Sequence, residues 1–390
     1  MSKILFLTHV GDPGGAEFKM IDLCVDLGEK AEVLHFQEGS LSAHLSQKNI
    51  AHQVLPLPAA LVGFKREQAF GKAFPLLLQS FGFLRKLYAA TRGYSSYVCM
   101  SQKAFVLLSL LKPLHRKPVI WFMNDLLSTD HFSPSLMSML TTLAKFSANH
   151  LVLNSQASYD AWIQAGGIKR NVEIIYPGTD FHLIETRIRD HEKIMALKEK
   201  LQAKDKIIVG LFGRITPWKG QEIFLEALSK IPNAHGLIVG EAFFGEEDYQ
   251  QHLQELTRRL QIESKVTFTG HSDQVPEWMA VCDIVVHCST AAEPFGLVIV
   301  EGMAAHKPVI ASDGGGAQEI VTDRVTGQLT PMKDAAALAA AINRYIENPV
   351  WAKELALNGY TRSKQLFSTQ AMLDKFRSIL ARHSISVQNS

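Results

Sequence analysis

The chain has 390 residues, of which 47% are hydrophobic and 20% are charged, and its formal net charge at pH 7 is +2. A chain of this length is expected to form two domains, and the composition is that of globular proteins with an ample core. The charge shows no global bias, and no RNA- or DNA-binding motif accompanies the basic residues, which argues against nucleic acid as a partner.

The cysteines and the N-terminal residues bear on the compartment. Cys24, Cys99, Cys282 and Cys288 lie in apolar segments without a C-x-x-C pair, so we expect buried thiols in a reducing compartment. The first residues lack the long apolar run and cleavage site of a signal peptide, and no window reaches the ~18 apolar residues that a membrane span needs. We therefore expect a cytoplasmic protein, which could still touch a membrane surface.

Short apolar segments alternate with helical patterns along the chain. Residues 3–10 have the continuous apolar run of a buried parallel strand, and a GDPGG turn follows them. The next segment has helical spacing of apolar residues at Phe18, Ile21, Leu23, Val25 and Leu27. Because the same alternation recurs in both halves, the sequence predicts an α/β fold with doubly wound parallel sheets.

The most informative stretch is AAEPFGLVIVEGMAA, residues 291–305. Glu293 precedes a proline and a glycine, which predicts a loop, and the following apolar run predicts a short buried helix. Glu301 lies inside that run, where an ionised carboxylate needs a partner, and a vicinal diol would supply two hydroxyl donors. The start of the helix should attract an anion such as phosphate through the N–H groups of Phe295, Gly296 and Leu297.

These features are those of a nucleotide-sugar site. The alternative is that Glu293 is a solvated loop acid and that Glu301 pairs with a buried Lys or Arg. The segment between the two acids resembles the E-x7-E motif of retaining glycosyltransferases with the two-domain GT-B fold, specifically family 4, the glycosyl transferases group 1. Together with the motifs described next, the resemblance covers nearly the whole chain.

Two basic residues follow the strand predicted over residues 207–212. Arg214 ends this strand and Lys219 lies on the next turn, and either could be an ordinary surface charge. A planar guanidinium and a point-like ammonium are well suited to a pyrophosphate. Their pattern, G-R-x4-K-G before an amphipathic helix, resembles the GT-B motif and implies that both residues hold the donor phosphates.

Three further places match the family pattern or depart from it. Gly14 and Gly15, which could simply form a tight turn, resemble the segment that closes over the donor diphosphate. Asn124 ends a predicted strand where the family usually has a His near the transferred sugar, and Asn cannot carry a proton; Asn124 and Asp125 could instead be helix caps. His271 stands where the family builds the wall that binds the base, and we expect it to form hydrogen bonds or a cap.

The resemblance also implies the domain organisation. Two Rossmann-like domains are expected to face each other across a cleft, and a hinge sequence, YPGTD, ends the first. The expected parts are an acceptor-binding domain over 1–180, a linker over 181–206, a nucleotide-sugar-binding domain over 207–367, and a C-terminal helix over 368–390 that crosses back to the first domain.

The reaction implied by the resemblance is sugar transfer, with retention, from a nucleotide diphosphate-sugar to a hydroxyl of a saccharide or lipid-linked acceptor, in polysaccharide or glycolipid synthesis. UDP-glucose is the first choice of donor. No D-x-D pair lies at a strand end, so we expect neither a metal nor another cofactor, with Arg214, Lys219 and the helix start neutralising the leaving diphosphate. Glu293 and Asn124 complete the expected catalytic set.

Alternatives to this reaction have their own sequence requirements. A sugar phosphorylase of the same fold would need the motif of a pyridoxal phosphate lysine, and a dehydrogenase would need G-x-G-x-x-G; both are missing. A non-catalytic nucleotide-sugar binder of the same fold remains an alternative, because Asn124 replaces the family His.

One segment departs from the overall charge balance. Residues 61–120 contain a single acid, Glu67, and several aromatic residues. Such a segment could lie on an anionic membrane at its inner face or bind an acidic acceptor, or it could be a solvated face over an aromatic core. Its basic residues are Lys65, Arg66, Lys72, Arg85, Lys86, Arg92, Lys103, Lys112, Arg116 and Lys117.

Overall fold

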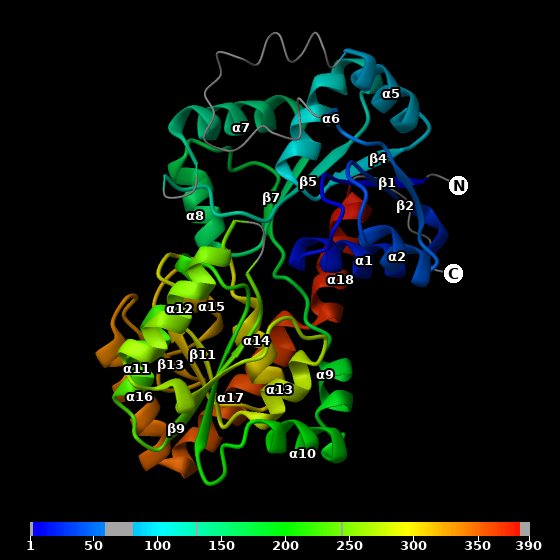
Figure 1. Cartoon of the computed structure of the whole chain (residues 1–390). Coiled ribbons are helices and arrows are strands. Elements are labelled where there is room, and N and C mark those ends of the chain that lie inside the picture. Colours follow the sequence, from blue (N-terminus) through cyan, green and yellow to red (C-terminus); the bar gives the residue numbers. More distant parts are fainter. Residues whose placement is uncertain (1–2, 59–80, 130–131, 243–244, 383–390) are drawn as a thin grey trace. The chain divides into compact units, whose positions relative to one another are not determined.

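The computed structural model describes residues 3–58, 81–129, 132–242 and 245–382. The chain forms two compact units (Figure 1). The first comprises Met1–Pro177 and Met372–Ser390, and the second comprises Gly178–Ala371. Within the described ranges, no helix is both long and apolar enough to span a membrane.

The first unit contains a seven-stranded parallel sheet in the order β3-β2-β1-β4-β5-β6-β7. The strand order reverses between β1 and its neighbour β4, which is the switch point of a doubly wound sheet. The strands are β1 (Ile4–Thr8), β2 (Ala31–His35), β3 (Ala51–Val54), β4 (Ser96–Cys99), β5 (Val119–Met123), β6 (His150–Leu153) and β7 (Val172–Ile174).

Helices cover both faces of this sheet, and the alternation of side chains along β1 shows why. Ile4 and Phe6 pack into one core with α1, α2 and α18, whereas Leu5 and Leu7 pack into the other core with α5, α6, α7 and α8. The helices are α1 (Gly15–Leu27), α2 (Leu41–Gln47), α5 (Phe81–Thr91), α6 (Gln102–His115), α7 (Pro134–Ser147), α8 (Gln156–Gln164) and α18 (Thr369–Arg382).

The buried face of α1 differs in part from the predicted one. Ile21, Leu23 and Leu27 are buried as expected, but Phe18 is 48% exposed and Val25 is 52% exposed. The inward positions are taken instead by Met20, Cys24 and the charged residue Lys19. The helix is therefore rotated about its axis relative to the orientation that would bury all of its apolar residues.

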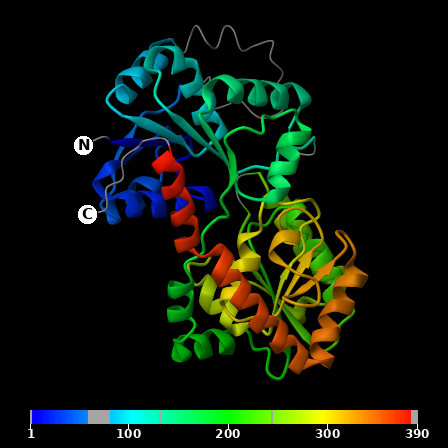
Figure 2. The same ribbon diagram turned by 180° about the vertical axis from the view of Figure 1, so that it is seen from behind.

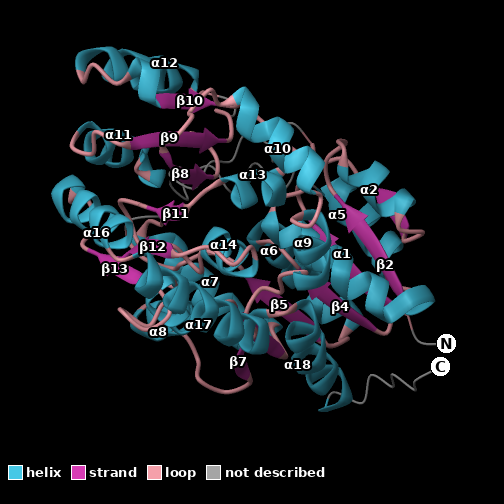
Figure 3. Cartoon of the chain, turned by 90° about the horizontal axis from the view of Figure 1, so that it is seen from below, coloured by secondary structure: helices cyan, strands magenta, loops and turns pink. Residues whose placement is uncertain are grey.

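The second unit contains a six-stranded parallel sheet in the order β10-β9-β8-β11-β12-β13, so its strand order reverses between β8 and β11. Helices flank the sheet, as the ribbon coloured by secondary structure shows (Figure 3). The strands are β8 (Ile207–Phe212), β9 (Ala234–Val239), β10 (Val266–Phe268), β11 (Ile284–His287), β12 (Val309–Ser312) and β13 (Gln328–Thr330).

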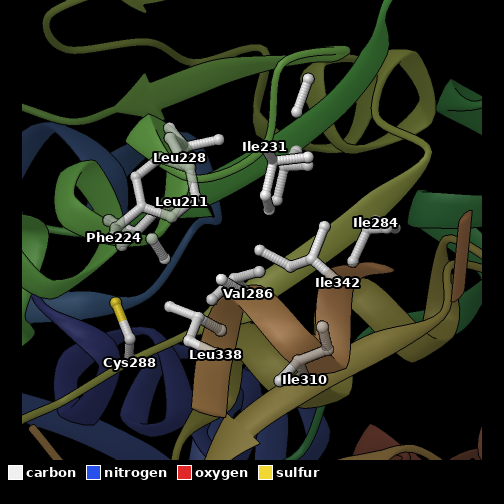
Figure 4. Close-up of a cluster of buried hydrophobic side chains, with 14 of the residues drawn as sticks. Leu211, Phe224, Leu228, Ile231, Ile284, Val286, Cys288, Ile310, Leu338 and Ile342 are labelled. Atoms are coloured by element: carbon white, nitrogen blue, oxygen red, sulfur yellow. The ribbon is translucent and has the colours of Figure 1, made fainter. Parts of the chain in front are cut away.

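The helices of the second unit pack a continuous apolar core against these strands. Leu211, Val286 and Ile310 of the central strands meet Phe224 of α11 and Leu338 of α16 (Figure 4). The helices are α9 (Phe181–Arg187), α10 (His191–Lys200), α11 (Gln221–Ser229), α12 (Glu247–Arg259), α13 (Val275–Val281), α14 (Leu297–Ala304), α15 (Ala317–Ile320), α16 (Ala335–Glu347) and α17 (Pro349–Phe367), with a short 3-10 helix, η3 (Pro217–Lys219).

The segment 181–206, expected to be a linker, forms α9 and α10 within the second unit. Two of its basic residues bind the buried acid Glu277 of α13: Arg187 at 2.7 Å and Lys193 at 3.1 Å. These ion pairs anchor the segment to the second unit, whose first residue is Gly178.

The C-terminal helix α18 belongs to the first unit, as expected. Figure 2 follows the chain from the orange helix α17 into the red helix α18. Met372, Phe376, Ile379 and Leu380 are buried in the core that lies beneath α1, and Arg377 pairs with Asp26 of α1. Two doubly wound, Rossmann-like units and a returning C-terminal helix therefore confirm the predicted fold class. All four cysteines are buried free thiols, as predicted.

Candidate active site

The candidate site lies at the carboxyl edge of the second sheet, where β8 and β11 diverge. This is the position at which open α/β sheets bind ligands, because loops from diverging strands leave room between them. Arg214 follows β8, Lys219 ends η3, and Glu293 lies on the loop between β11 and α14. The fold therefore brings Lys219 and Glu293, 74 positions apart, into contact.

Glu293 is the centre of a buried polar cluster. One of its oxygens, Oε1, lies 2.6 Å from Nζ of Lys219 and 2.9 Å from Nε2 of His287, and it also accepts a hydrogen bond from Oγ of Ser289. The residue is 6% exposed, so the interpretation of Glu293 as a solvated loop acid is wrong. Burial by itself raises the pKa of Glu293, but the charges of His287 and Lys219 outweigh it and hold this pKa well below its usual value.

Glycines after β12 hold the Glu293 loop in place. The backbone N–H of Gly316 donates to the carbonyl of Glu293 at 2.9 Å. A Cβ atom on Gly315 would lie 2.3 Å from that carbonyl oxygen, and one on Gly316 would lie 2.4 Å from Cα of Phe295. The two backbones touch too closely for any side chain, which explains the run of glycines at this place.

The turn that carries Lys219 is held against the same loop. A Cβ atom on Gly220 would lie 1.9 Å from the carbonyl oxygen of Cys288, and the N–H of Thr290 donates to the carbonyl of Trp218 at 2.8 Å. The ammonium of Lys219 also lies 4.4 Å from the centroid of the Trp218 ring. Lys219 is thus fixed by its backbone and by its side chain.

Arg214 differs from Lys219 because its side chain is exposed at the end of β8. Its backbone carbonyl accepts a hydrogen bond of 2.8 Å from the buried side chain of Gln221, which fixes the main chain beneath the guanidinium. The guanidinium therefore stands at the edge of the sheet where a ligand can reach it.

Helix α14 begins as predicted, directly after the Glu293 loop. Gly296 is its N-cap residue, with a φ of 111° that side chains rarely adopt, and Leu297 is the first helical residue. Phe295 packs against Phe367 at a ring-centroid distance of 5.3 Å. The N-terminus of α14 thus lies beside the Glu293 cluster.

Glu301 is half-buried on α14, four residues into the helix. Burial raises its pKa, and the positive charge of Lys219 opposes this effect in part. Lys219 forms its ion pair with Glu293 and not with Glu301. The alternative in which Glu293 is solvated is therefore wrong. A half-buried carboxylate with a raised pKa favours ligands that donate hydrogen bonds to it.

The first unit has its own polar centre at the switch point of its sheet. Asn124 follows β5, and its Oδ1 accepts a hydrogen bond of 2.8 Å from Lys19 while its Nδ2 donates at 2.9 Å to the carbonyl of Met100. Asn124 is therefore not a helix cap. Gly14, the N-cap residue of α1, donates its N–H to Glu17 at 3.1 Å.

Comparison with known proteins decides the family. The model of the family "Glycosyl transferases group 1" matches residues 194–363. The crystal structure of Anabaena HepE in complex with UDP and glucose is 34% identical in sequence, superposes with a TM-score of 0.87, and covers 98% of this chain and 100% of its own. The chain belongs to the group 1 glycosyltransferases.

Other relatives of this group 1 glycosyltransferase extend the comparison. LpsE of Rhizobium meliloti, a lipopolysaccharide core biosynthesis glycosyltransferase, is 29% identical over 177 residues, which are 45% of this chain and 50% of the relative. The chain thus spans about half the length of the curated relatives that it matches. Sucrose-phosphate synthase of Thermosynechococcus elongatus, 21% identical with a TM-score of 0.77 over 98% of this chain and 99% of its own, shares the fold.

The predicted site residues of this group 1 glycosyltransferase fall into two sets. Arg214, Lys219, Glu293, Glu301 and the 295–297 turn gather at one sheet edge of the second unit, whereas Gly14, Gly15 and Asn124 lie in the first unit. His271 follows β10 and is exposed; its ring lies 3.3 Å from Asp273 and 3.7 Å from Glu241.

Sequence reasoning missed three polar residues that the structure places in these centres. His287 and Ser289 bind Glu293, and Lys19 donates a hydrogen bond to Asn124. A signal existed for the first two, because polar residues that end a buried strand lie at the ligand edge of a parallel sheet. In the part of the chain that the structure describes, no group of three or more His, Cys, Asp or Glu side chains could hold a metal ion.

Proposed function

We propose that this protein transfers a sugar, with glucose as first choice, from a UDP-sugar to a hydroxyl group of an acceptor, with retention of configuration. The observation that carries the proposal is the similarity, over the whole chain, to Anabaena HepE, which has been crystallised with UDP-glucose. The cluster of cations and a carboxylate at the switch point of the second sheet supplies the chemistry that such a donor needs.

In the proposal, the donor diphosphate binds to Arg214, Lys219 and the N-terminus of α14. These groups are positive and lie at one edge of the second sheet, and Lys219 and the start of α14 are held in place, so they can stabilise charge that develops on the leaving diphosphate. Lys219 would then exchange its Glu293 oxygen for a phosphate oxygen. Glu293 keeps its negative charge, because His287 and Ser289 still bind it, and it can accept hydrogen bonds from sugar hydroxyls.

Glu301 is proposed to bind the ribose. The residue is half-buried, and burial raises the pKa of its carboxyl group, which disfavours the ionised form. The two hydroxyls of a ribose diol would donate to both carboxylate oxygens and favour the ionised form. Binding of a nucleoside should therefore lower the pKa of Glu301.

The proposed chemical step needs no protein base. The bond from the sugar to the diphosphate oxygen breaks, a bond to the acceptor oxygen forms on the same face, and the acceptor proton passes to an oxygen of the leaving phosphate. Asn124 cannot remove this proton. Any role of Gly14, Gly15 and His271 toward the donor stays a prediction.

A non-catalytic nucleotide-sugar binder of the same fold is the second candidate, and the Asn at position 124 favours it. Incubation with UDP-glucose separates the two, with UDP release followed by chromatography against the Glu293→Gln variant as a control. We expect slow release by the natural protein that the variant lacks. Tight UDP binding without release, with or without candidate acceptors, would favour the binder.

The nucleotide and sugar can be assigned by thermal shift. A ligand that binds only the folded protein stabilises it by RT ln(1 + [L]/Kd), about 2.7 kcal/mol at a hundredfold excess over Kd. UDP-glucose, UDP and the GDP, ADP and CDP analogues should therefore rank by affinity. A larger shift with another base than with uracil would overturn the choice of UDP.

The acceptor is proposed to be a saccharide or a lipid-linked saccharide, in polysaccharide or glycolipid synthesis, as the names of the Rhizobium meliloti relatives suggest. The surface of α5 and α6 in the first unit supports contact with an anionic membrane. Phe81 is 72% exposed and Leu114 is 63% exposed, beside the basic residues Arg85, Lys86 and Arg116. Of the other predicted residues, Arg92 and Lys117 are exposed and Lys103 and Lys112 are partly buried. Lys65, Arg66, Glu67 and Lys72 lie outside the described residues.

Flotation with phosphatidylserine vesicles tests this contact. Each basic residue near an anionic leaflet contributes about 1 kcal/mol, and salt screens the effect within a Debye length. Binding at low salt should weaken when salt rises and when Lys65, Arg66, Arg85 and Lys86 are changed to Gln. The control carries Gln at four exposed lysines of the second unit, Lys200, Lys204, Lys230 and Lys353. Equal binding of both variants would refute the membrane surface.

A further inference from the structure

The first unit contains a lysine whose burial the proposed reaction does not explain. Lys19 is 4% exposed on the inward face of α1. Its Nζ atom lies 2.8 Å from Oδ1 of Asn124 and 5.6 Å from the centroid of the Phe122 ring. Burying an ammonium group costs free energy unless it makes specific contacts, so the contacts of Lys19 must offset this cost.

The two contacts of Asn124 fix the direction of its side-chain amide. Lys19 can only donate a hydrogen bond, so the atom that faces it must be the amide oxygen. The carbonyl of Met100 can only accept, so the atom 2.9 Å from it must be the amide nitrogen. A rotation of the amide by 180° would break both hydrogen bonds and place donor against donor.

The centre lies where a ligand is expected. Asn124 follows β5, Met100 follows β4, and Lys19 lies on the helix that follows β1, so the three residues surround the switch point of the first sheet. Asn124 is half-buried, which leaves part of its side chain within reach of a ligand. Among the residues that the structure describes, Met100 and Lys19 are the partners of this amide, so its second N–H and a lone pair on Oδ1 are left for a ligand.

Lys19 also connects this centre to the glycine-rich turn. The carboxylate of Glu17 accepts hydrogen bonds from Thr8 at 2.8 Å and from the N–H of Gly14 at 3.1 Å. Burial lowers the pKa of Lys19 to about 8, and the negative charge of Glu17 opposes this effect. The turn and the Asn124 amide are thus coupled electrostatically through Glu17 and Lys19.

We propose that Lys19 is a positioning residue that fixes the amide of Asn124 with its second N–H toward an oxygen lone pair of the transferred sugar. The ligand atom is a hydroxyl or ether oxygen of that sugar, and Asn124 acts as a hydrogen-bond donor to it. This inference rests on the proposed sugar transfer. It gives the contact between Lys19 and Asn124 a function, namely to hold the side-chain amide in one orientation.

A double-mutant cycle on turnover tests the proposal. Lys19→Met, Asn124→Ala and the double variant are compared with the natural protein by UDP release from UDP-glucose, with water as the acceptor. If Lys19 acts through Asn124, each single variant should lose at least tenfold in kcat/KM, and the double variant should lose no more than about twofold beyond Asn124→Ala. Lys19→Arg keeps a donor and should recover turnover to within about threefold.

Controls separate positioning from loss of structure. UDP affinity by calorimetry should not change in any of these variants, since the proposed nucleotide contacts lie in the second unit. Lys48→Met, at an exposed position of the same unit, should match the natural protein. Losses that multiply in the double variant, or a Lys19→Met variant within twofold of the natural protein, would overturn the inference while the proposed function stands. A natural protein that neither binds UDP nor releases it would overturn both.

Discussion

Lys219 and Glu293 form an ion pair of 2.6 Å, although the sequence assigned one to the phosphates and the other to the sugar of the donor. Their side chains are 18% and 8% exposed, so water screens the pair only weakly. Each charge also compensates the other, because burying an unpaired charge would cost free energy. If the donor binds as proposed, donor binding and the stability of the site are linked through the same two atoms, Nζ of Lys219 and Oε1 of Glu293.

The first prediction concerns the free energy of unfolding. Lys219→Met and Glu293→Gln should each destabilise the protein by about 3 kcal/mol, because each leaves a charged partner buried. The double variant should cost clearly less than the sum, since it removes both charges. Denaturant unfolding of the four proteins measures this coupling, and strictly additive losses would contradict a direct pair.

The second prediction concerns turnover. Arg214→Ala should lower kcat/KM for UDP-glucose by two to three orders of magnitude, about 3–4 kcal/mol, which is typical for the loss of one preorganised electrostatic contact. Its melting temperature should hardly change, because the guanidinium is exposed. Lys230→Ala, an exposed charge at the end of α11, is the matched control. Near-natural turnover of Arg214→Ala would remove this residue from the phosphate site.

The third prediction concerns the glycines after β12. Gly316→Ala should destabilise the protein by about 2 kcal/mol or more, because its Cβ would lie 2.4 Å from the backbone of Phe295. Gly314→Ala is the control, since the nearest atom to its Cβ is the flexible end of Met332 at 2.9 Å. Thermal unfolding should show a clear gap between the two variants, and equal melting temperatures would contradict the close approach.

The fourth prediction concerns pH. The pKa of Lys19 falls from 10.5 to about 8 on folding. Between these values the unfolded chain keeps the proton that the folded protein has lost, so stability must rise with pH in this window. The free energy of unfolding of the natural protein, relative to Lys19→Met, should increase by about 3 kcal/mol from pH 7 to pH 10.5. A difference that stays flat across this range would show that Lys19 titrates normally.

The fifth prediction concerns metal ions. Turnover of UDP-glucose should survive EDTA, because in the proposed function Arg214, Lys219 and the start of α14 supply positive charge to the diphosphate. Initial rates with EDTA, with Mg²⁺ and with Mn²⁺ measure this directly. Loss of activity in EDTA that Mg²⁺ or Mn²⁺ restores would overturn the metal-free reading.

Local patterns in the sequence were enough to predict the strands, the loop that carries Glu293 and the start of α14. Each depends on nearby residues, such as the apolar run before Arg214 or the Pro-Phe-Gly turn. The structure also has Arg214 directly after β8 and Lys219 on the following turn, as the sequence predicts, while their roles toward the donor stay predictions.

Contacts between distant segments could not be predicted in this way. Lys219 and Glu293 are 74 positions apart, and Lys19 and Asn124 are 105 apart, so only the packed fold brings them together. The same packing overrides the apolar spacing of α1, where Phe18 is exposed and Lys19 is buried. The burial of a charged residue such as Lys19 is decided by tertiary packing, and helix propensity and apolar periodicity do not predict it.

The burial of α18 in the first core has a consequence for how the protein can be cut and recombined. Residues 178–371 are an insertion within the first unit, whose last helix is encoded after them. A fragment ending at residue 177 would expose the apolar surface that Met372, Phe376, Ile379 and Leu380 cover, at about 1.5–3 kcal/mol for each side chain. A workable chimera therefore exchanges the inserted segment as a cassette and keeps both flanks from one parent.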